Sequence, residues 1–248
     1  MAAVVMVHGA FNELWGAHEI KARWLPALRD GLVHAGATVA EDDVEVGFYG
    51  DLFRRPVEPG ALASFEQTRA GVAEMLSGVL GTGSEAIEAL GAAANEAVLD
   101  RTIDLVTTMA TDPELRDKIA ARIDAVITPD TKVVVAHSLG SVVMYRYLTT
   151  RPELTPDLVT MGSPLGAPTL GALDPSLGKD GAHPWPGGVG RWTNVAAVGD
   201  RAAVEPRLAT LFGDRVEDHT VDNGHRVHDP EPYLNSACTG AAVARALA

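Results

Sequence analysis

Residues 132–143 read KVVVAHSLGSVV and combine a strand, a serine turn and the start of a helix. The apolar run at 133–136 contains three valines and an alanine, which is typical of a strand buried on both faces. Ser138 follows, and the apolar run at 142–148 predicts a helix. A serine between a strand and a helix lies in a sharp turn at the end of a sheet. The free N–H groups of the helix N-terminus can then stabilise negative charge beside its hydroxyl.

Length and composition limit the classes of protein to consider. The 248 residues are enough for one large α/β domain or two small domains, and 46% hydrophobic with 21% charged residues allows a sizeable core. The net charge of −13, without a basic cluster, disfavours nucleic acid or an anionic membrane as a partner. The single cysteine, Cys238, excludes an internal disulfide framework and gives no metal site, which fits a cytoplasmic protein.

Neither a leader peptide nor a membrane span is expected. The first nine residues have no basic segment and only a short apolar run before a histidine and a glycine, so we interpret them as a first strand. The Ala- and Gly-rich residues 71–110 are interrupted repeatedly by charged side chains, which argues against a transmembrane helix.

The apolar pattern predicts six strands that alternate with helices. Their expected bounds are 3–7, 43–48, 132–136, 158–161, 192–198 and 215–221, and a last helix is expected over 234–248. Such alternation predicts a single α/β domain over residues 1–248, with a mostly parallel sheet and helices on both faces. The active site is then expected at the carboxyl ends of the strands.

Residues 61–127 are almost wholly helical in pattern and longer than a simple crossover connection requires. We interpret most of this segment as a helical cap or lid insertion. Its apolar face, which includes Met75 and Leu76, is expected to line an acyl pocket. Alternatively, these side chains pack against one another or against a second subunit, which would make a homodimer through the insertion.

Three motifs together resemble the α/β-hydrolase family, in particular bacterial lipase-like and esterase-like serine hydrolases. The first is A-H-S-L-G at 136–140, which departs from the family's G-x-S-x-G by having Ala136 in place of the first glycine. The others are the His-Gly pair at 8–9 and the Gly-Ser-Pro stretch at 162–164. The resemblance implies the α/β-hydrolase fold, with Ser138 as the nucleophile.

The resemblance also implies where the oxyanion and the acyl group would bind. The backbone N–H groups of Ala10 and Leu139 are the expected oxyanion donors. Phe11 and Leu165 join the candidates for the substrate pocket. Ser163 is expected to be a turn residue, because a proline follows it rather than a helix.

The family's chain order of serine, acid and histidine selects the other two catalytic candidates. Asp200 follows a predicted strand downstream of the serine. His228 and His225 both lie in the loop after the last strand, and related sequences place a tyrosine five residues after the histidine. His228 with Tyr233 matches that spacing, so His228 is the expected base and His225 the alternative. His137 is expected to point away from Ser138, toward a packing or hydrogen-bonding role.

The resemblance therefore implies hydrolysis of a carboxylic ester or thioester through an acyl-enzyme on Ser138, with a small-molecule acyl substrate and no cofactor. The apolar insertion favours a medium to long acyl chain. Two alternatives remain open. An acyltransferase, cyclase or peptidase would use the same acyl-enzyme, and a ligand-binding protein would use the scaffold without catalysis.

Overall fold

A computed structural model describes residues 2–54, 108–109, 111–167 and 183–248. The chain divides into two compact units, one formed by Met1–Phe53 with Met109–Ala248 and the other by Arg54–Thr108. The pocket candidates Met75 and Leu76 lie outside the described residues. The proposed cap and its contact with a second subunit therefore stay predictions.

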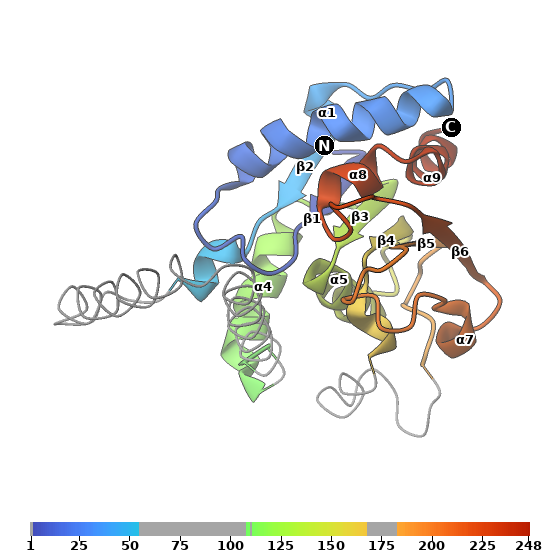
Figure 1. The fold of residues 1–248 in the computed structure, drawn as a ribbon. Helices are drawn as coiled ribbons and strands as arrows, with labels where there is room; N and C mark the ends of the chain where they lie inside the picture. Colours follow the sequence, from blue (N-terminus) through green and yellow to red (C-terminus); the bar gives the residue numbers. More distant parts are fainter. Residues whose placement is uncertain (1, 55–107, 110, 168–182) are drawn as a thin grey trace, which may run out of the picture. The chain divides into compact units, whose positions relative to one another are not determined.

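The first unit contains a six-stranded sheet in which every neighbouring pair is parallel (Figure 1). Each strand end lies within one residue of the predicted bounds, which confirms the predicted α/β class and six-stranded sheet. The order across the sheet is β2-β1-β3-β4-β5-β6. The strands are β1 (Val4–Val7), β2 (Val44–Gly47), β3 (Val133–His137), β4 (Asp157–Met161), β5 (Trp192–Ala197) and β6 (Val216–Val221).

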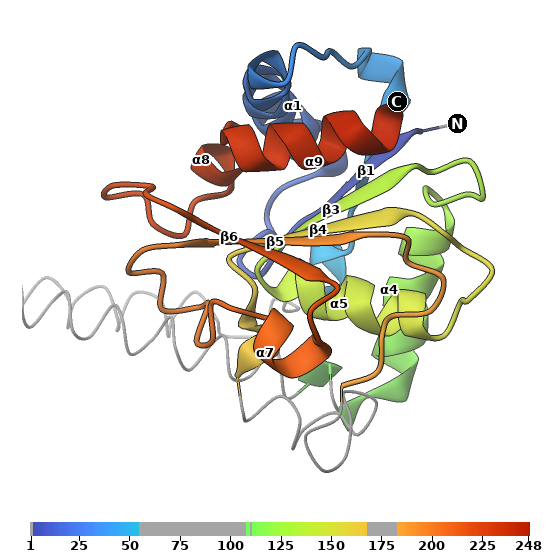
Figure 2. The ribbon, with the colours of Figure 1, turned by 90° about the vertical axis from the view of Figure 1, so that its right-hand side faces the viewer.

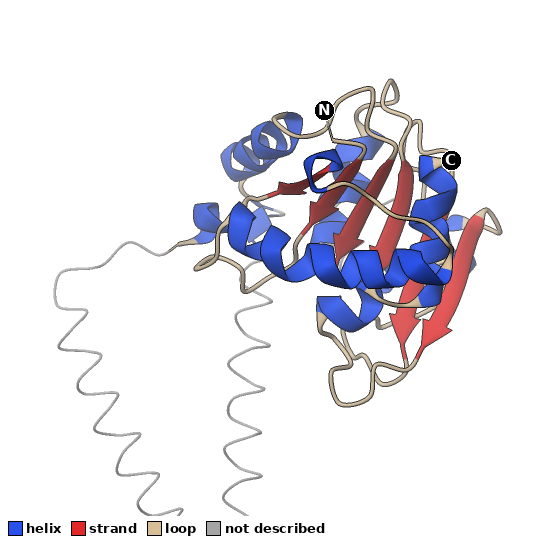
Figure 3. Ribbon diagram, turned by 90° about the horizontal axis from the view of Figure 1, so that it is seen from above, coloured by secondary structure: helices blue, strands red, loops and turns tan. Residues whose placement is uncertain are grey.

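Helices cover both faces of the sheet, as Figure 2 shows. One face carries α1 (Ala17–His34), α8 (Pro230–Leu234) and α9 (Ala237–Leu247), and the other carries α4 (Pro113–Asp124), α5 (Leu139–Thr149) and α7 (Ala209–Phe212). Burial on both faces explains why β1 and β3 are apolar almost throughout. Seen from above in Figure 3, the strands run side by side in one direction, so their carboxyl ends share one edge. None of the helices that the structure describes is long and apolar enough to cross a membrane.

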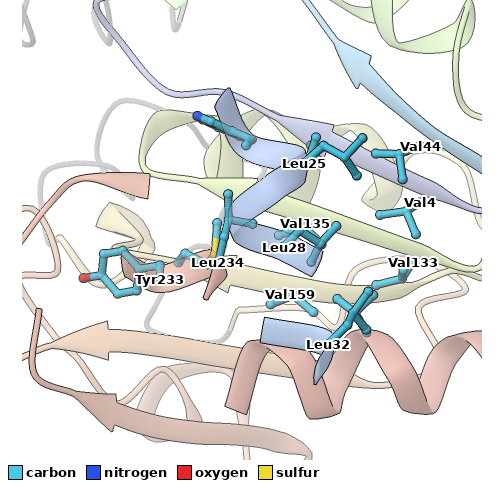
Figure 4. Packing of buried hydrophobic residues seen from close by; sticks show 14 of the residues in the cluster. Val4, Leu25, Leu28, Leu32, Val44, Val133, Val135, Val159, Tyr233 and Leu234 are labelled. Carbon is cyan, nitrogen blue, oxygen red and sulfur yellow. The ribbon is translucent and has the colours of Figure 1, made fainter. Parts of the chain in front are cut away.

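The main hydrophobic core lies between the sheet and helices α1, α8 and α9 (Figure 4). Val133 and Val135 of β3 belong to this core, together with Leu28 and Leu32 of α1. Val134 is equally buried, and strand alternation directs its side chain to the opposite face. Strand β3, near the middle of the sheet, is therefore packed on both faces.

Two predicted helical segments differ in detail from the structure. Helix α4 lies inside the predicted insertion at 61–127, yet it belongs to the same compact unit as the sheet. The helix predicted over 234–248 begins three residues later, as α9, because Ser236 accepts a hydrogen bond from the N–H of Thr239 and caps it, whereas Leu234 ends the separate helix α8. A serine at this position is a strong N-terminal cap, which the Ala-rich pattern obscured.

Helices α1 and α9 cross in backbone contact at a pair of glycines. A Cβ atom at Gly240 of α9 would overlap the carbonyl oxygen of Gly31 in α1, and a Cβ atom at Gly31 would overlap the carbonyl oxygen of Leu234. The helix layer above the core can approach this closely only because both positions lack a side chain.

We therefore expect Gly240→Val to lower the free energy of unfolding by about 3 kcal/mol or more, since the new side chain must separate the helices. Urea unfolding followed by circular dichroism measures the change. The matched control is Ala241→Val, which introduces the same side chain at the next, exposed position of α9. Equal midpoints for the two variants would contradict the close crossing.

Candidate active site

The candidate site lies where the chain changes direction across the sheet. Strands β1 and β3 are neighbours, but the chain continues from β1 to β2 on one side and from β3 to β4 on the other. In open parallel sheets, connections that diverge in this way leave a crevice at the carboxyl ends of the two strands. The loop after β1 and the turn at Ser138 occupy this position.

Ser138 has a backbone conformation that non-glycine residues rarely adopt. Its φ of 53° and ψ of −128° make it, with Phe11, one of two non-glycine residues with positive φ in the described ranges. Its N–H donates to the carbonyl of Met161 in β4 at 2.9 Å. Its carbonyl accepts from the N–H of Ser141 at 2.9 Å and from the Ser141 hydroxyl at 2.6 Å. These bonds hold the serine in a strained turn between β3 and α5.

A further serine, Ser163 in the turn after β4, supports the turn at Ser138. Because the Ser141 hydroxyl proton is used on the carbonyl of Ser138, the Ser163 hydroxyl must donate to Ser141 Oγ, 2.7 Å away. Ser163 Oγ in turn accepts from the N–H of Leu165 at 3.2 Å. Ser163 is thus a turn and capping residue, and the pocket candidate Leu165 is buried beside it, with 3% of its surface exposed.

The loop after β1 touches the serine turn directly. A Cβ atom at Gly9 would lie 2.7 Å from Ser138 Cβ, and one at Gly140 would lie 2.5 Å from the carbonyl oxygen of His8. Real Cβ atoms do not approach other atoms so closely. Glycine is therefore required at positions 9 and 140 for the same reason: the loop after β1 lies in close contact with the N-terminus of α5.

The two expected oxyanion donors lie in these contacting segments. The N–H groups of Ala10 and Leu139 donate to no acceptor within the described part of the chain. The Asn12 side chain donates to the carbonyl oxygens of Gly9 and Ala10 at 3.1 and 2.8 Å, which holds the loop after β1 in shape. Phe11, the neighbouring pocket candidate, is 43% exposed.

Ser138, His228 and Asp200 form one continuous hydrogen-bonded row. His228 Nε2 lies 2.9 Å from Ser138 Oγ, and His228 Nδ1 lies 2.9 Å from Asp200 Oδ2. His225 is exposed in the same loop, and neither of these two bonds involves it. The structure therefore brings together the three residues that the sequence favoured, with His228 as the histidine between serine and aspartate.

The Asp200 carboxylate is buried and accepts three hydrogen bonds within the described part of the chain. Its side chain is 1% exposed, whereas that of His228 is 39% exposed. Oδ2 also accepts from the Tyr233 hydroxyl at 2.6 Å, and Oδ1 accepts from the N–H of Ala202 at 2.9 Å. Burial alone would raise the pKa of Asp200, but the hydrogen bonds from His228, Tyr233 and Ala202 outweigh it and lower that pKa.

These contacts assign the protons along the row. An ionised Asp200 only accepts, so His228 Nδ1 must carry the proton between them. In the neutral ring, Nε2 is then the acceptor, and the Ser138 hydroxyl donates to it. This arrangement places a base against a serine hydroxyl and an anion behind the base.

Gly162 allows the turn after β4 to pass close to Asp200 and His228. It has a φ of +54°, and a Cβ atom there would lie 2.8 Å from Asp200 Oδ2 and 3.1 Å from His228 Nδ1. Any side chain would push the aspartate and the histidine apart. The Gly-Ser-Pro stretch thus supplies a glycine against the imidazole of His228 and a serine that bonds to Ser141 in the turn of Ser138.

Two further histidines are buried beside the row. Burial lowers the pKa of His137 to about 3, helped by repulsion from His228, and burial lowers the pKa of His8 to about 4. His137 Nε2 donates to the backbone carbonyl of His228 at 2.8 Å. His8 Nδ1 donates to the carbonyl of Gly9, and its Nε2 accepts from the N–H of Tyr49. Both rings are therefore neutral hydrogen-bonding groups.

Sequence analysis identified only part of the role of the residues that surround Ser138, His228 and Asp200. The sequence analysis uses Tyr233 only for its spacing from His228 and does not predict its hydrogen bond to Asp200. Ser141 was also missed, although a serine three residues after Ser138 can reach back to the carbonyl of Ser138. His137 points away from Ser138 toward the carbonyl of His228, in line with the expected hydrogen-bonding role.

Comparisons with protein-family models, with curated proteins and with solved structures found no match for this chain. Within the described ranges, no group of three or more histidine, cysteine, aspartate or glutamate side chains could hold a metal ion. The function is therefore inferred from the geometry of Ser138, His228 and Asp200.

The buried neutral histidines predict how stability depends on pH. Their folded pKa values lie below the usual 6.5, so their full contribution to stability is present above about pH 6.5 and is lost as the pH falls toward 4 and 3. By about pH 5 each should cost on the order of 2 kcal/mol, because the unfolded chain takes up a proton that the folded chain does not. Urea unfolding between about pH 7 and pH 5 measures this loss.

We expect His137→Gln and His8→Gln each to flatten the pH dependence by about one proton. The exposed His225→Gln variant is the control and should leave it unchanged. If all three variants kept the wild-type dependence, the neutral state assigned to the buried rings would be wrong.

Proposed function

We propose that this protein is a serine hydrolase that cleaves a carboxylic ester or thioester through an acyl-enzyme on Ser138. The observation that carries the proposal is the row Ser138–His228–Asp200, with both bonds at 2.9 Å and the serine in a strained turn at the N-terminus of α5. The position of the row at the divergence of β1 and β3 adds support, as does the parallel α/β sheet expected of an α/β-hydrolase.

In the first half of the proposed reaction, Ser138 Oγ attacks the acyl carbonyl carbon while His228 Nε2 takes the hydroxyl proton. The carbonyl oxygen becomes an oxyanion, for which the N–H groups of Ala10 and Leu139 are the proposed donors. Asp200 stabilises the imidazolium that forms. When the oxyanion collapses, the bond to the leaving alcohol or thiol breaks, and His228 returns the proton to that leaving group.

In the second half, water takes the place of the leaving group. His228 Nε2 accepts a proton from the water as its oxygen attacks the acyl carbon, and the bond to Ser138 Oγ then breaks. Ser138 recovers its proton from His228 and the carboxylic acid departs. The 39% exposure of the His228 side chain is compatible with access for substrate and water.

A fluorophosphonate probe and p-nitrophenyl butyrate test this proposal directly. We expect intact-mass spectrometry to find one adduct on Ser138, and no adduct in Ser138→Ala. Turnover should fall by roughly 10⁶ in Ser138→Ala and His228→Ala, and by roughly 10⁴ in Asp200→Asn, because each change removes the nucleophile, its base or the group that orients that base. His225→Ala is the matched control from the same loop and should retain wild-type labelling and turnover.

Three other results of this experiment would contradict or change the proposal. Folded wild-type protein without an adduct would contradict the hydrolase and favour a ligand-binding protein. Labelling lost in His225→Ala but kept in His228→Ala would show that His225 is the base and that the choice of His228 is wrong. Acylated amine or alcohol in place of free acid, when a competing nucleophile is added, would instead identify an acyltransferase.

A further inference from the structure

Oδ2 of Asp200 accepts a second hydrogen bond that the proposed reaction does not use. The Tyr233 hydroxyl lies 2.6 Å from this oxygen, which is closer than the 2.9 Å of His228 Nδ1. Tyr233 lies on α8, and its side chain is fully buried. In Figure 4 its ring lies at the edge of the core cluster, and the hydroxyl points away from the labelled valines and leucines.

The direction of this hydrogen bond is determined by a third group. The N–H of Ala197, the last residue of β5, donates to the Tyr233 oxygen at 2.9 Å, so the phenolic proton is free to donate to Asp200. Burial, reinforced by the neighbouring carboxylate, raises the pKa of Tyr233 and keeps this donor protonated. The chain of donors runs from the end of β5 through Tyr233 to the aspartate.

The contacts leave the Asp200 carboxylate little freedom to rotate. The N–H of Ala202 holds Oδ1, and Tyr233 holds Oδ2 from a fully buried position. The loop of His228 has a separate anchor, because His137 donates to its backbone carbonyl. Loss of the phenolic hydroxyl would therefore act on the carboxylate while the histidine loop keeps its own support.

We propose that Tyr233 is a positioning residue that holds Asp200 Oδ2 in place to accept the proton of His228 Nδ1. Among the described residues, no hydrogen bond joins Tyr233 to Ser138, so Tyr233 acts through Asp200. Its importance for turnover rests on the proposed hydrolase function, whereas its effect on the His228 ring can be measured without any substrate.

A second tyrosine provides a closely matched control. The Tyr147 hydroxyl donates to Asp124 Oδ1, also at 2.6 Å, and joins α5 to α4 away from the serine row. Tyr233→Phe and Tyr147→Phe each remove one phenolic hydrogen bond to an aspartate and keep the ring. A merely structural tyrosine would predict similar consequences for both variants.

We expect Tyr233→Phe to remain folded and to lower kcat for p-nitrophenyl butyrate by about 10- to 100-fold with KM nearly unchanged, the size of one hydrogen bond to a charged group. Tyr147→Phe should keep wild-type kcat. Nitrogen NMR of histidine-labelled protein should show the His228 ring with its proton on Nδ1 in the wild type and in Tyr147→Phe. In Tyr233→Phe the same signals should move toward a mixture of the two tautomers.

The two readouts separate this proposal from the hydrolase function. Tyr233→Phe with wild-type kcat and wild-type ring signals would overturn the positioning role, as would equal losses in both tyrosine variants. Wild-type protein that neither hydrolyses the ester nor reacts with the fluorophosphonate would overturn the hydrolase. A tautomer change confined to Tyr233→Phe would then still establish that Tyr233 positions Asp200.

Discussion

The strained backbone of Ser138 is the constraint on which the geometry of the site depends. A residue with a φ of 53° stays in place only when its neighbours hold both backbone groups, here through Met161 and Ser141. The turn exposes the hydroxyl at the sheet edge and starts α5 immediately behind it. The same constraint requires glycine at position 9, where the loop after β1 passes against the serine side chain.

The parallel sheet converts this local turn into a meeting point of distant segments. Strands β1, β3, β4 and β5 end at one edge, and each is followed by groups that touch the serine row. The turn after β4 supplies Gly162 and Ser163 beneath the row, and the loop after β5 supplies Asp200. A rigid, doubly covered sheet is well suited to hold such groups at hydrogen-bonding distance.

The charges around the row place one anion, Asp200, against the His228 ring. Asp200 is buried and ionised, and the nearby rings of His137 and His8 are neutral because burial disfavours their charged forms. A second positive charge at His137 would oppose protonation of His228, whose ring centroid lies 4.8 Å away. A neutral His137 can instead support the His228 loop through its carbonyl.

The sequence by itself determined the strands and the serine turn, because burial and turn chemistry leave local patterns in the chain. The resemblance to the α/β-hydrolase family, through its chain order of serine, acid and histidine, selected the three residues of the row. It also favoured His228 over His225 through the spacing to Tyr233. Only the tertiary structure decided the partners of Tyr233, His137 and Ser163, which lie 33, 91 and 22 residues away along the chain. Such pairings depend on which strand ends adjoin in the sheet, and local periodicity carries no information about that order.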